Sequence, residues 1–222
     1  MEIKVLRDVL SANDAIARRN RSRLDKHNTL AVNVMSSPGA GKTSLILRTI
    51  EKLKGQIRIA VIEGDVASTI DADKVSKEGV AVVQINTAGG CHLDANMVEN
   101  ALNNLPLEEA GLLFIENVGN LICPAGFALG EHKRVILLST PEGDDKAYKY
   151  PTIFIDADVV LINKVDLLPL LDFNVTSFTR AVNGLNPEVK IFQVSYKTGQ
   201  GLEGWFSWLQ EQTKEMKSRR GS

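Results

Sequence analysis

The sequence has few cysteines and few aromatic residues, and it has no apolar run long enough to cross a membrane. Only 2 of its 222 residues are cysteine, too few for a disulfide framework, so both are expected to stay reduced. Without a membrane span, or a signal peptide before the first strand, a cytoplasmic protein with no membrane partner is predicted. A formal net charge of −1 excludes the strongly basic surface that is typical of nucleic-acid-binding proteins.

The chain does contain a regular alternation of apolar strands and helices. The strand-like runs lie at 30–35, 58–62, 80–85, 112–116, 134–138, 158–162 and 190–194. This alternation predicts an α/β fold, a mostly parallel sheet of about seven strands with helices on both faces. We assign residues 28–222 to this domain, and no internal repeat is present.

Residues 1–27 predict an amphipathic N-terminal helix. Ile3, Leu10, Ala17 and Leu24 recur at heptad spacing, and basic residues crowd the second half. A helix docked on the domain is the favoured interpretation, and a partner-binding arm is the alternative.

A phosphate-binding loop is predicted at residues 36–43, Ser-Ser-Pro-Gly-Ala-Gly-Lys-Thr, between a buried strand and a helix. Glycines let successive N–H groups point at one anion, Lys42 can reach the β- and γ-phosphates, and the Thr43 hydroxyl can bind Mg²⁺. The usual first glycine is replaced by Ser36, which requires a negative φ there. The predicted phosphate contacts are Ser37, Pro38, Gly39, Ala40, Gly41, Lys42, Thr43 and Ser44.

Carboxylates follow two of the strands, where ligands bind in open parallel sheets. Asp65 and Asp71 follow the second strand, and Glu116 ends the fourth. We predict a Mg²⁺ site made by Thr43, Asp65, Asp71 and Glu116, with Lys42, Asp65 and Glu116 acting in hydrolysis. Either aspartate could instead cap a helix. Gly119, in the turn after Glu116, can offer its N–H to a γ-phosphate.

The stretch Asn163-Lys164-Val165-Asp166, at the end of a strand, predicts guanine as the base. A carboxylate at Asp166 can accept from N1–H and the exocyclic amine of guanine, and adenine offers no such pair of donors. Lys164 can lie along the base, and Asn163 can tie this loop to the phosphate loop. In the later stretch Ser195, Tyr196 and Lys197, a backbone N–H can meet guanine O6. We therefore predict a protein that binds GTP and GDP.

Cys91, His92 and Cys123 predict a second metal site. Each follows a segment expected to sense the nucleotide, and thiolate and imidazole ligands suit Zn²⁺ or Ni²⁺. Buried thiols with a surface histidine are the alternative interpretation. Three ligands are one short of a closed tetrahedral site, which implies an open position or a site shared between subunits.

These motifs together resemble the hydrogenase nickel-incorporation (maturation) GTPases, over nearly the whole chain. The resemblance is carried by residues 12–14, 38–43, 63–66, 91–95, 114–124 and 163–166. It implies a phosphate-loop NTPase of the SIMIBI type that hydrolyses GTP slowly and forms a homodimer with nucleotide. It also implies metal ligands at Cys91, His92 and Cys123. The implied partners are a nickel metallochaperone and the hydrogenase large subunit.

Two other functions stay open at this point. Urease accessory GTPases resemble this chain in the phosphate loop, although their metal motif is typically Cys-Pro-His. A nucleotide-gated metal-binding module without significant hydrolysis is the alternative from another class. Some bacterial members of the resembled family carry an N-terminal cysteine-rich or histidine-rich metal site. This chain has neither motif.

Overall fold

All seven predicted strands form in the structure, a computed structural model that describes residues 4–66 and 69–218, with side chains from residue 11. Ile3 and the side chain of Leu10, part of the predicted heptad, lie outside the described part. The strands are β1 (Leu30–Ser36), β2 (Ile59–Asp65), β3 (Ala81–Asn86), β4 (Leu112–Glu116), β5 (Lys133–Ser139), β6 (Val159–Asn163) and β7 (Lys190–Gln193).

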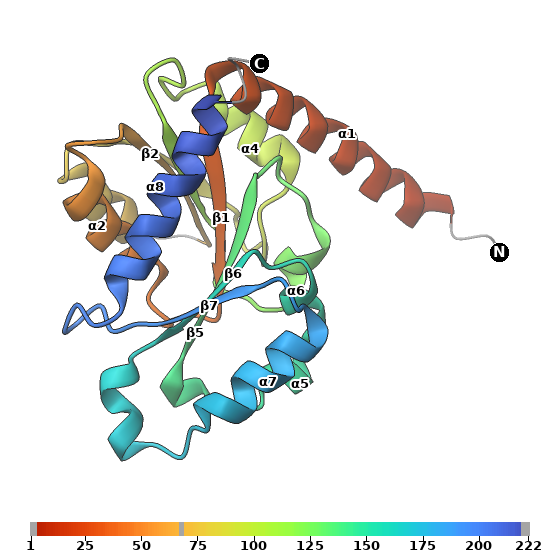
Figure 1. The fold of residues 1–222 in the computed structure, drawn as a ribbon. Coiled ribbons are helices and arrows are strands. Elements are labelled where there is room, and N and C mark those ends of the chain that lie inside the picture. Colours follow the sequence, from red (N-terminus) through yellow and green to blue (C-terminus); the bar gives the residue numbers. More distant parts are fainter. Residues whose placement is uncertain (1–3, 67–68, 219–222) are drawn as a thin grey trace.

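Helices connect the strands throughout (Figure 1). The α-helices are α1 (Lys4–His27), α2 (Lys42–Leu53), α3 (Ile70–Ser76), α4 (Ala95–Leu102), α5 (Lys146–Lys149), α6 (Pro151–Ile155), α7 (Val175–Leu185) and α8 (Leu202–Ser218). The 3-10 helices are η1 (Cys123–Gly126), η2 (Thr140–Glu142) and η3 (Val165–Leu170).

The strands form one sheet in the order β3-β2-β4-β1-β5-β6-β7, and every pairing is parallel. All residues of the central strand β1 are buried, as expected for an apolar run covered on both faces. Because the strands are parallel, their carboxyl ends meet at one edge. The predicted α/β class with a parallel sheet is confirmed.

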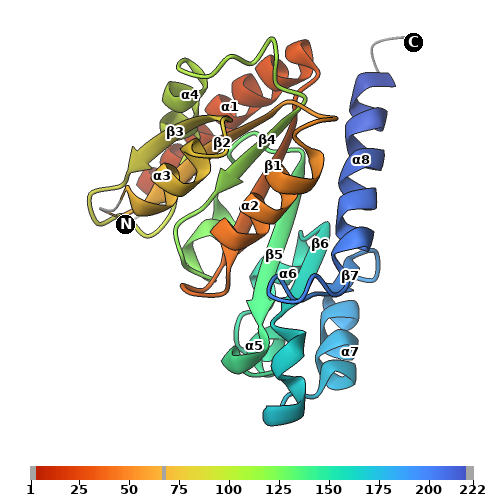
Figure 2. The same ribbon diagram turned by 90° about the vertical axis from the view of Figure 1, so that its left-hand side faces the viewer.

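Helices cover both faces of the sheet (Figure 2). On one face α2 and α8 pack over the sheet, and Trp205 of α8 donates to the Thr49 hydroxyl of α2 at 2.9 Å. The other face is covered by α1 and α4 beside β2, β4 and β1, and by α6 and α7 beside β5 and β6. These apolar layers hold the loops of the carboxyl edge in place.

From Asn13 onward α1 is docked on the domain, as the favoured interpretation expects, and toward its N-terminus the helix extends beyond the domain (Figure 1). Its Leu24 is fully buried between α4 and the sheet, and Ala17 is also buried. Arg19 makes two hydrogen bonds to Glu99 of α4. The division of the chain at residue 28 stays a prediction.

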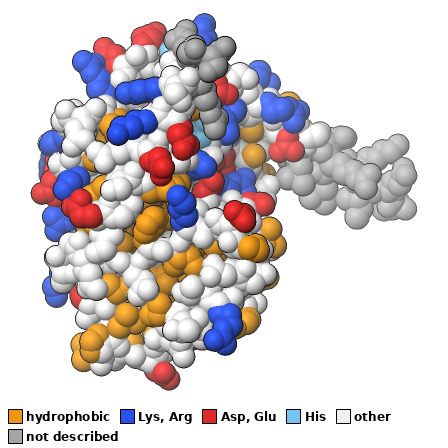
Figure 3. Space-filling model, in the orientation of Figure 1, with side chains coloured by type: hydrophobic (Ala, Val, Ile, Leu, Met, Phe, Trp, Pro, Cys, Tyr) orange, Lys and Arg blue, Asp and Glu red, His pale blue; other side chains and the backbone are white. Residues whose placement is uncertain are grey.

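The exposed surface carries mixed charges. On the face shown in Figure 3, acidic and basic side chains are interspersed, and hydrophobic side chains gather in the lower half. Among the described residues, no helix has the length and apolar character needed to span a bilayer.

The buried position of Leu24 gives a stability prediction. Leu24→Ala should lower the free energy of unfolding by about 2–5 kcal/mol, because a fully buried side chain leaves a cavity. Leu170→Ala is the matched control, since Leu170 is 80% exposed, and it should change stability by less than about 0.5 kcal/mol. Urea unfolding of both variants measures these free energies. If Leu24→Ala lowers the free energy of unfolding as little as Leu170→Ala does, α1 is not part of the cooperative core.

Candidate nucleotide and metal site

The phosphate loop connects β1 to α2 at the carboxyl edge. Gly39 and Gly41 have φ values of 74° and 111°, which favour glycine. A Cβ at Gly41 would lie 2.9 Å from Nδ2 of Asn163 and 3.2 Å from the Tyr196 ring. The loop therefore depends on glycine for its backbone angles, and at Gly41 also for close contact with the neighbouring loops.

Ser36 has the negative φ that its place in the phosphate loop requires. It ends β1, and among the described non-glycine residues positive φ occurs only at Asn28, Ala88 and Lys164. The Lys42 ammonium donates to the Ser36 hydroxyl at 3.3 Å. The amine thus lies across the loop, where it can meet phosphate oxygens.

Thr43 and Glu116 meet at the start of α2. The Thr43 hydroxyl donates to Oε1 of Glu116 at 2.9 Å, although the residues lie far apart in the chain. Glu116 is 3% exposed, and its Oε2 is buried without a hydrogen-bond partner. An unpartnered buried carboxylate oxygen beside a threonine hydroxyl fits a hard divalent cation.

Glu63, which the sequence analysis did not select, is a second buried carboxyl group at this edge. It is paired in register with Glu116 across β2 and β4, and its Oε2 also has no partner. Burial raises the pKa of Glu63 strongly, and the neighbouring Glu116 raises it further. Burial also raises the pKa of Glu116, against the opposing effect of Lys42.

The predicted aspartates join this cluster. Ligand atoms of Glu63, Asp65 and Asp71 lie within 4.8 Å of one another. Asp71 does not occupy the N-cap of α3, which is Thr69, and it pairs with Lys74 at 2.6 Å. The oxygen-rich donor set fits Mg²⁺.

The predicted base-binding residues come together on the other side of the phosphate loop. The Asn163 amide donates to the Ala40 carbonyl at 2.9 Å, the tie that was expected from the sequence. Lys164, in the left-handed conformation, donates to the Gly39 carbonyl at 3.0 Å. The Ser195 hydroxyl donates to Oδ1 of Asp166 at 2.7 Å, which fixes the carboxylate.

Tyr196 takes a different place from its neighbours. Its ring is buried in the core beneath Gly41, and burial raises the pKa of its hydroxyl. Its carbonyl accepts from Arg48 at 3.1 Å. The side chain therefore supports the phosphate loop, which leaves backbone N–H groups of this stretch as the candidates for the base.

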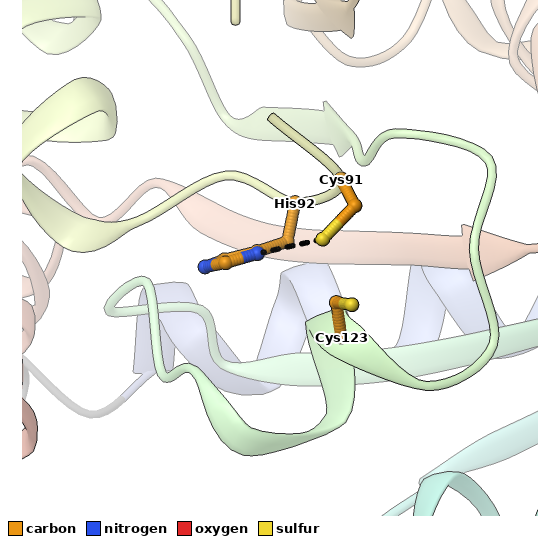
Figure 4. Close-up of side chains that lie close together, drawn as sticks. All are labelled: Cys91, His92 and Cys123. Carbon is orange, nitrogen blue, oxygen red and sulfur yellow. Dashed lines mark hydrogen bonds between the residues drawn. The ribbon is translucent and has the colours of Figure 1, made fainter. Parts of the chain in front are cut away.

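Cys91, His92 and Cys123 gather into one cluster (Figure 4). Their ligand atoms lie within 4.8 Å of one another, with Sγ of Cys91 at 3.5 Å from Nδ1 of His92. Metal–ligand bonds of about 2.0–2.3 Å in a tetrahedron need only slightly closer atoms, so the cluster fits a thiophilic metal. A hydrogen bond with Cys123 is the main cause that raises the pKa of the Cys91 thiol.

One buried amide connects this cluster to the carboxyl edge of the sheet, where the predicted nucleotide contacts lie and which we call the nucleotide edge. Asn117 directly follows Glu116, and its Oδ1 accepts from the N–H of Leu93, next to His92, at 3.1 Å. In the same turn, Gly119 lies against Pro38 of the phosphate loop, where a Cβ would be 3.0 Å from Pro38 Cγ. Asn117 was not selected from the sequence, since its partner lies on another loop.

A family model described as the CobW/HypB/UreG nucleotide-binding domain matches residues 30–193. The chain belongs to this family. It is 48% identical over 208 residues to a hydrogenase maturation factor HypB of Rhizobium leguminosarum bv. viciae, covering 94% of this chain and 70% of that protein. The resemblance inferred from the motifs is thereby confirmed.

A sequence and a crystal structure from Helicobacter pylori are also similar. A hydrogenase/urease maturation factor HypB is 41% identical over 218 residues, with 96% of this chain and 89% of that protein covered. A crystal structure of HypB in complex with nickel matches with a TM-score of 0.87 at 41% identity, covering 92% of this chain and 96% of that one. These matches confirm the expected nucleotide-binding fold.

The base loop of this family member gives a specificity prediction. Asp166→Asn should weaken GTP binding roughly 100-fold or more, because an amide replaces two charge-assisted acceptors with a donor that faces guanine donors. Xanthosine triphosphate should bind in its place. Fluorescent nucleotide titration measures both, with Asp156→Asn, an exposed aspartate, as the control. Unchanged GTP affinity would remove Asp166 from the base site.

The phosphate loop gives a second prediction. Lys42→Ala should slow GTP hydrolysis on the order of 100-fold or more, because it removes a charge that stabilises the developing phosphate oxyanions. Metal binding to the nucleotide-free protein should persist, since the cluster of Cys91, His92 and Cys123 is intact. Lys52→Ala, on the exposed face of α2, is the control. Hydrolysis at the wild-type rate would place the phosphate site elsewhere.

Proposed function

We propose that this chain is a GTP-hydrolysing switch that assists nickel insertion into the large subunit of a [NiFe]-hydrogenase. A nickel metallochaperone is its proposed partner. The family membership supports nucleotide binding, and the similar proteins named hydrogenase maturation factor support the pathway. The cytoplasmic location and the absence of nucleic-acid partners stay predictions.

The observation that carries the proposal is the position of the metal cluster beside the nucleotide edge. Cys123 lies in η1, on the segment that begins with Glu116 and passes Gly119 against Pro38. Cys91 and His92 precede Leu93, whose backbone N–H donates a hydrogen bond to Asn117. A movement of the turn after Glu116 on nucleotide exchange would therefore act on both halves of the cluster.

The nucleotide edge supplies the groups for phosphoryl transfer to water. Lys42 stabilises charge on the β- and γ-phosphates, and the Thr43 hydroxyl and Asp65 would hold Mg²⁺. The ion would neutralise phosphate charge when it is bound. Glu116 accepts a hydrogen bond from the Thr43 hydroxyl and would orient the attacking water, and Asp71 and Asp65 would complete the ion's surroundings.

A homodimer completes the proposed switch. One chain offers three ligands for Ni²⁺ or Zn²⁺, and a closed tetrahedral site needs a fourth. A second copy can bring its own ligands to the open position. GTP, by ordering the turn that carries Gly119 and Cys123, would favour this pairing.

Phosphate release separates the GTPase from a binding module without hydrolysis. Wild type should release phosphate from GTP slowly and only with Mg²⁺, and no release under either condition would favour the binding module. The enzyme that receives the nickel is identified in cells that lack this protein. The nickel content of the hydrogenase should fall in those cells. Loss of nickel from urease instead would favour the urease role, which the Helicobacter pylori hydrogenase/urease factor makes relevant.

Metal binding and dimer formation should be coupled in this mechanism. With a non-hydrolysable GTP analogue, Ni²⁺ or Zn²⁺ should tighten the dimer by about 5- to 150-fold, the range of typical coupling free energies. Cys123→Ala should dimerise with the analogue without this response to metal. Sedimentation velocity measures both proteins with and without metal. A wild type that stays monomeric in every condition would exclude the shared site while leaving the GTPase assignment intact.

A further inference from the structure

Two buried asparagines of α1 make an unusual set of contacts. Asn13 is 7% exposed and Asn20 is 1% exposed, and buried amides require hydrogen-bond partners. The Asn13 carbonyl oxygen accepts from the N–H of Ala95 at 2.9 Å, and its amide donates to the carbonyl of Ala128 at 2.9 Å. The Asn20 amide donates to the carbonyls of Ala95 and Leu129, at 2.8 Å and 3.0 Å.

These contacts fall on the two segments that carry the metal cluster. Ala95 is the first residue of α4, three positions after His92. Ala128 and Leu129 follow the 3-10 helix that begins at Cys123. Each asparagine therefore bridges the segment of Cys91 and His92 to the segment of Cys123.

The histidine itself rests on the bridged segment. The rings of His92 and Phe127 lie with centroids 4.0 Å apart at an interplanar angle of 31°. Phe127 directly precedes Ala128, whose carbonyl accepts the hydrogen bond from Asn13. The imidazole thus packs against the segment that Asn13 contacts.

The packing of α1 leaves this bridge little freedom. A Cβ at Gly130 would lie 2.6 Å from Cβ of Asn20 and 2.7 Å from the Ala17 carbonyl, so the backbone at Gly130 touches the helix directly. The interface is tight at the positions where the two asparagines act.

We propose that Asn13 and Asn20 are positioning residues of the metal site. Through these two residues, α1 sets the distance between the segment that carries Cys91 and His92 and the segment that carries Cys123. This inference rests on the proposed metal site. Outer residues that orient metal ligands commonly change metal affinity 10- to 100-fold, although they never touch the metal. The N-terminal helix is then part of the metal site, and its docking controls how tightly metal is held.

The test compares Asn13→Ala and Asn13→Asp with Arg23→Ala. Asn13→Asp keeps an acceptor for the Ala95 N–H and loses the donor to Ala128. Arg23 joins α1 to the far end of α4, where it donates to the Leu102 carbonyl and to Asn103, so its loss weakens docking away from the cluster. Competition titration measures Ni²⁺ and Zn²⁺ affinity, and Co²⁺ absorption bands report ligand geometry. GTP-analogue affinity and thermal unfolding show that each variant is folded.

Both Asn13 variants should lose roughly 10- to 100-fold in metal affinity and show altered Co²⁺ bands, with unchanged nucleotide affinity. Arg23→Ala should keep wild-type metal affinity and bands. The inference is overturned if the Asn13 variants bind metal as wild type does, or if Arg23→Ala weakens metal equally. Asn13→Asp decides the question if Asn13→Ala does not fold.

Cys123→Ala separates this failure from failure of the metal site itself. If wild type and Cys123→Ala bind metal equally, the cluster is not the site and the proposed switch fails with it. If Cys123→Ala loses metal and the Asn13 variants keep it, only the role of α1 is wrong.

Discussion

The parallel pairing of β4 with both β1 and β2 is the constraint on which the rest of the structure depends. It places Glu116 in register with Val34 on one side and Glu63 on the other. The phosphate loop continues from β1, so Thr43 reaches the Glu116 carboxylate. Every proposed nucleotide contact lies at this one edge because parallel strands end together, and the metal cluster lies on the loops that leave it.

Charge at this edge is unbalanced within the described part of the chain. Glu63 and Glu116 are buried side by side, and Lys42 is the cation that opposes the rise in both of their pKa values. Burying a carboxylate that has an unpartnered oxygen is costly, and its pKa rises when the opposing positive charge is too small. The edge is therefore suited to a divalent cation, which would supply the missing partner of these oxygens and would neutralise the charge of bound phosphates.

Much of the site was predictable because its determinants are local in the sequence. The phosphate loop and the stretch Asn163–Asp166 each combine the end of a strand with a fixed spacing of residues. Such a motif can be recognised from neighbouring residues alone, without knowledge of how distant elements pack. Glu63 was missed because its importance comes from Glu116 on another strand. Asn117 and Phe127 were missed for the same reason, since their partners Leu93 and His92 lie on a different loop.

The sequence by itself determined the strands and the α/β class, and it predicted the proposed phosphate and base loops, because apolar periodicity and short motifs are encoded locally. It also named Cys91, His92 and Cys123 by residue type. Only the tertiary structure decided that these three meet, because the loops after β3 and β4 approach each other only when β2 pairs with both strands. It alone showed Asn13 and Asn20 of α1 bridging the two ligand segments, since a buried amide finds its partners only after the helix has docked.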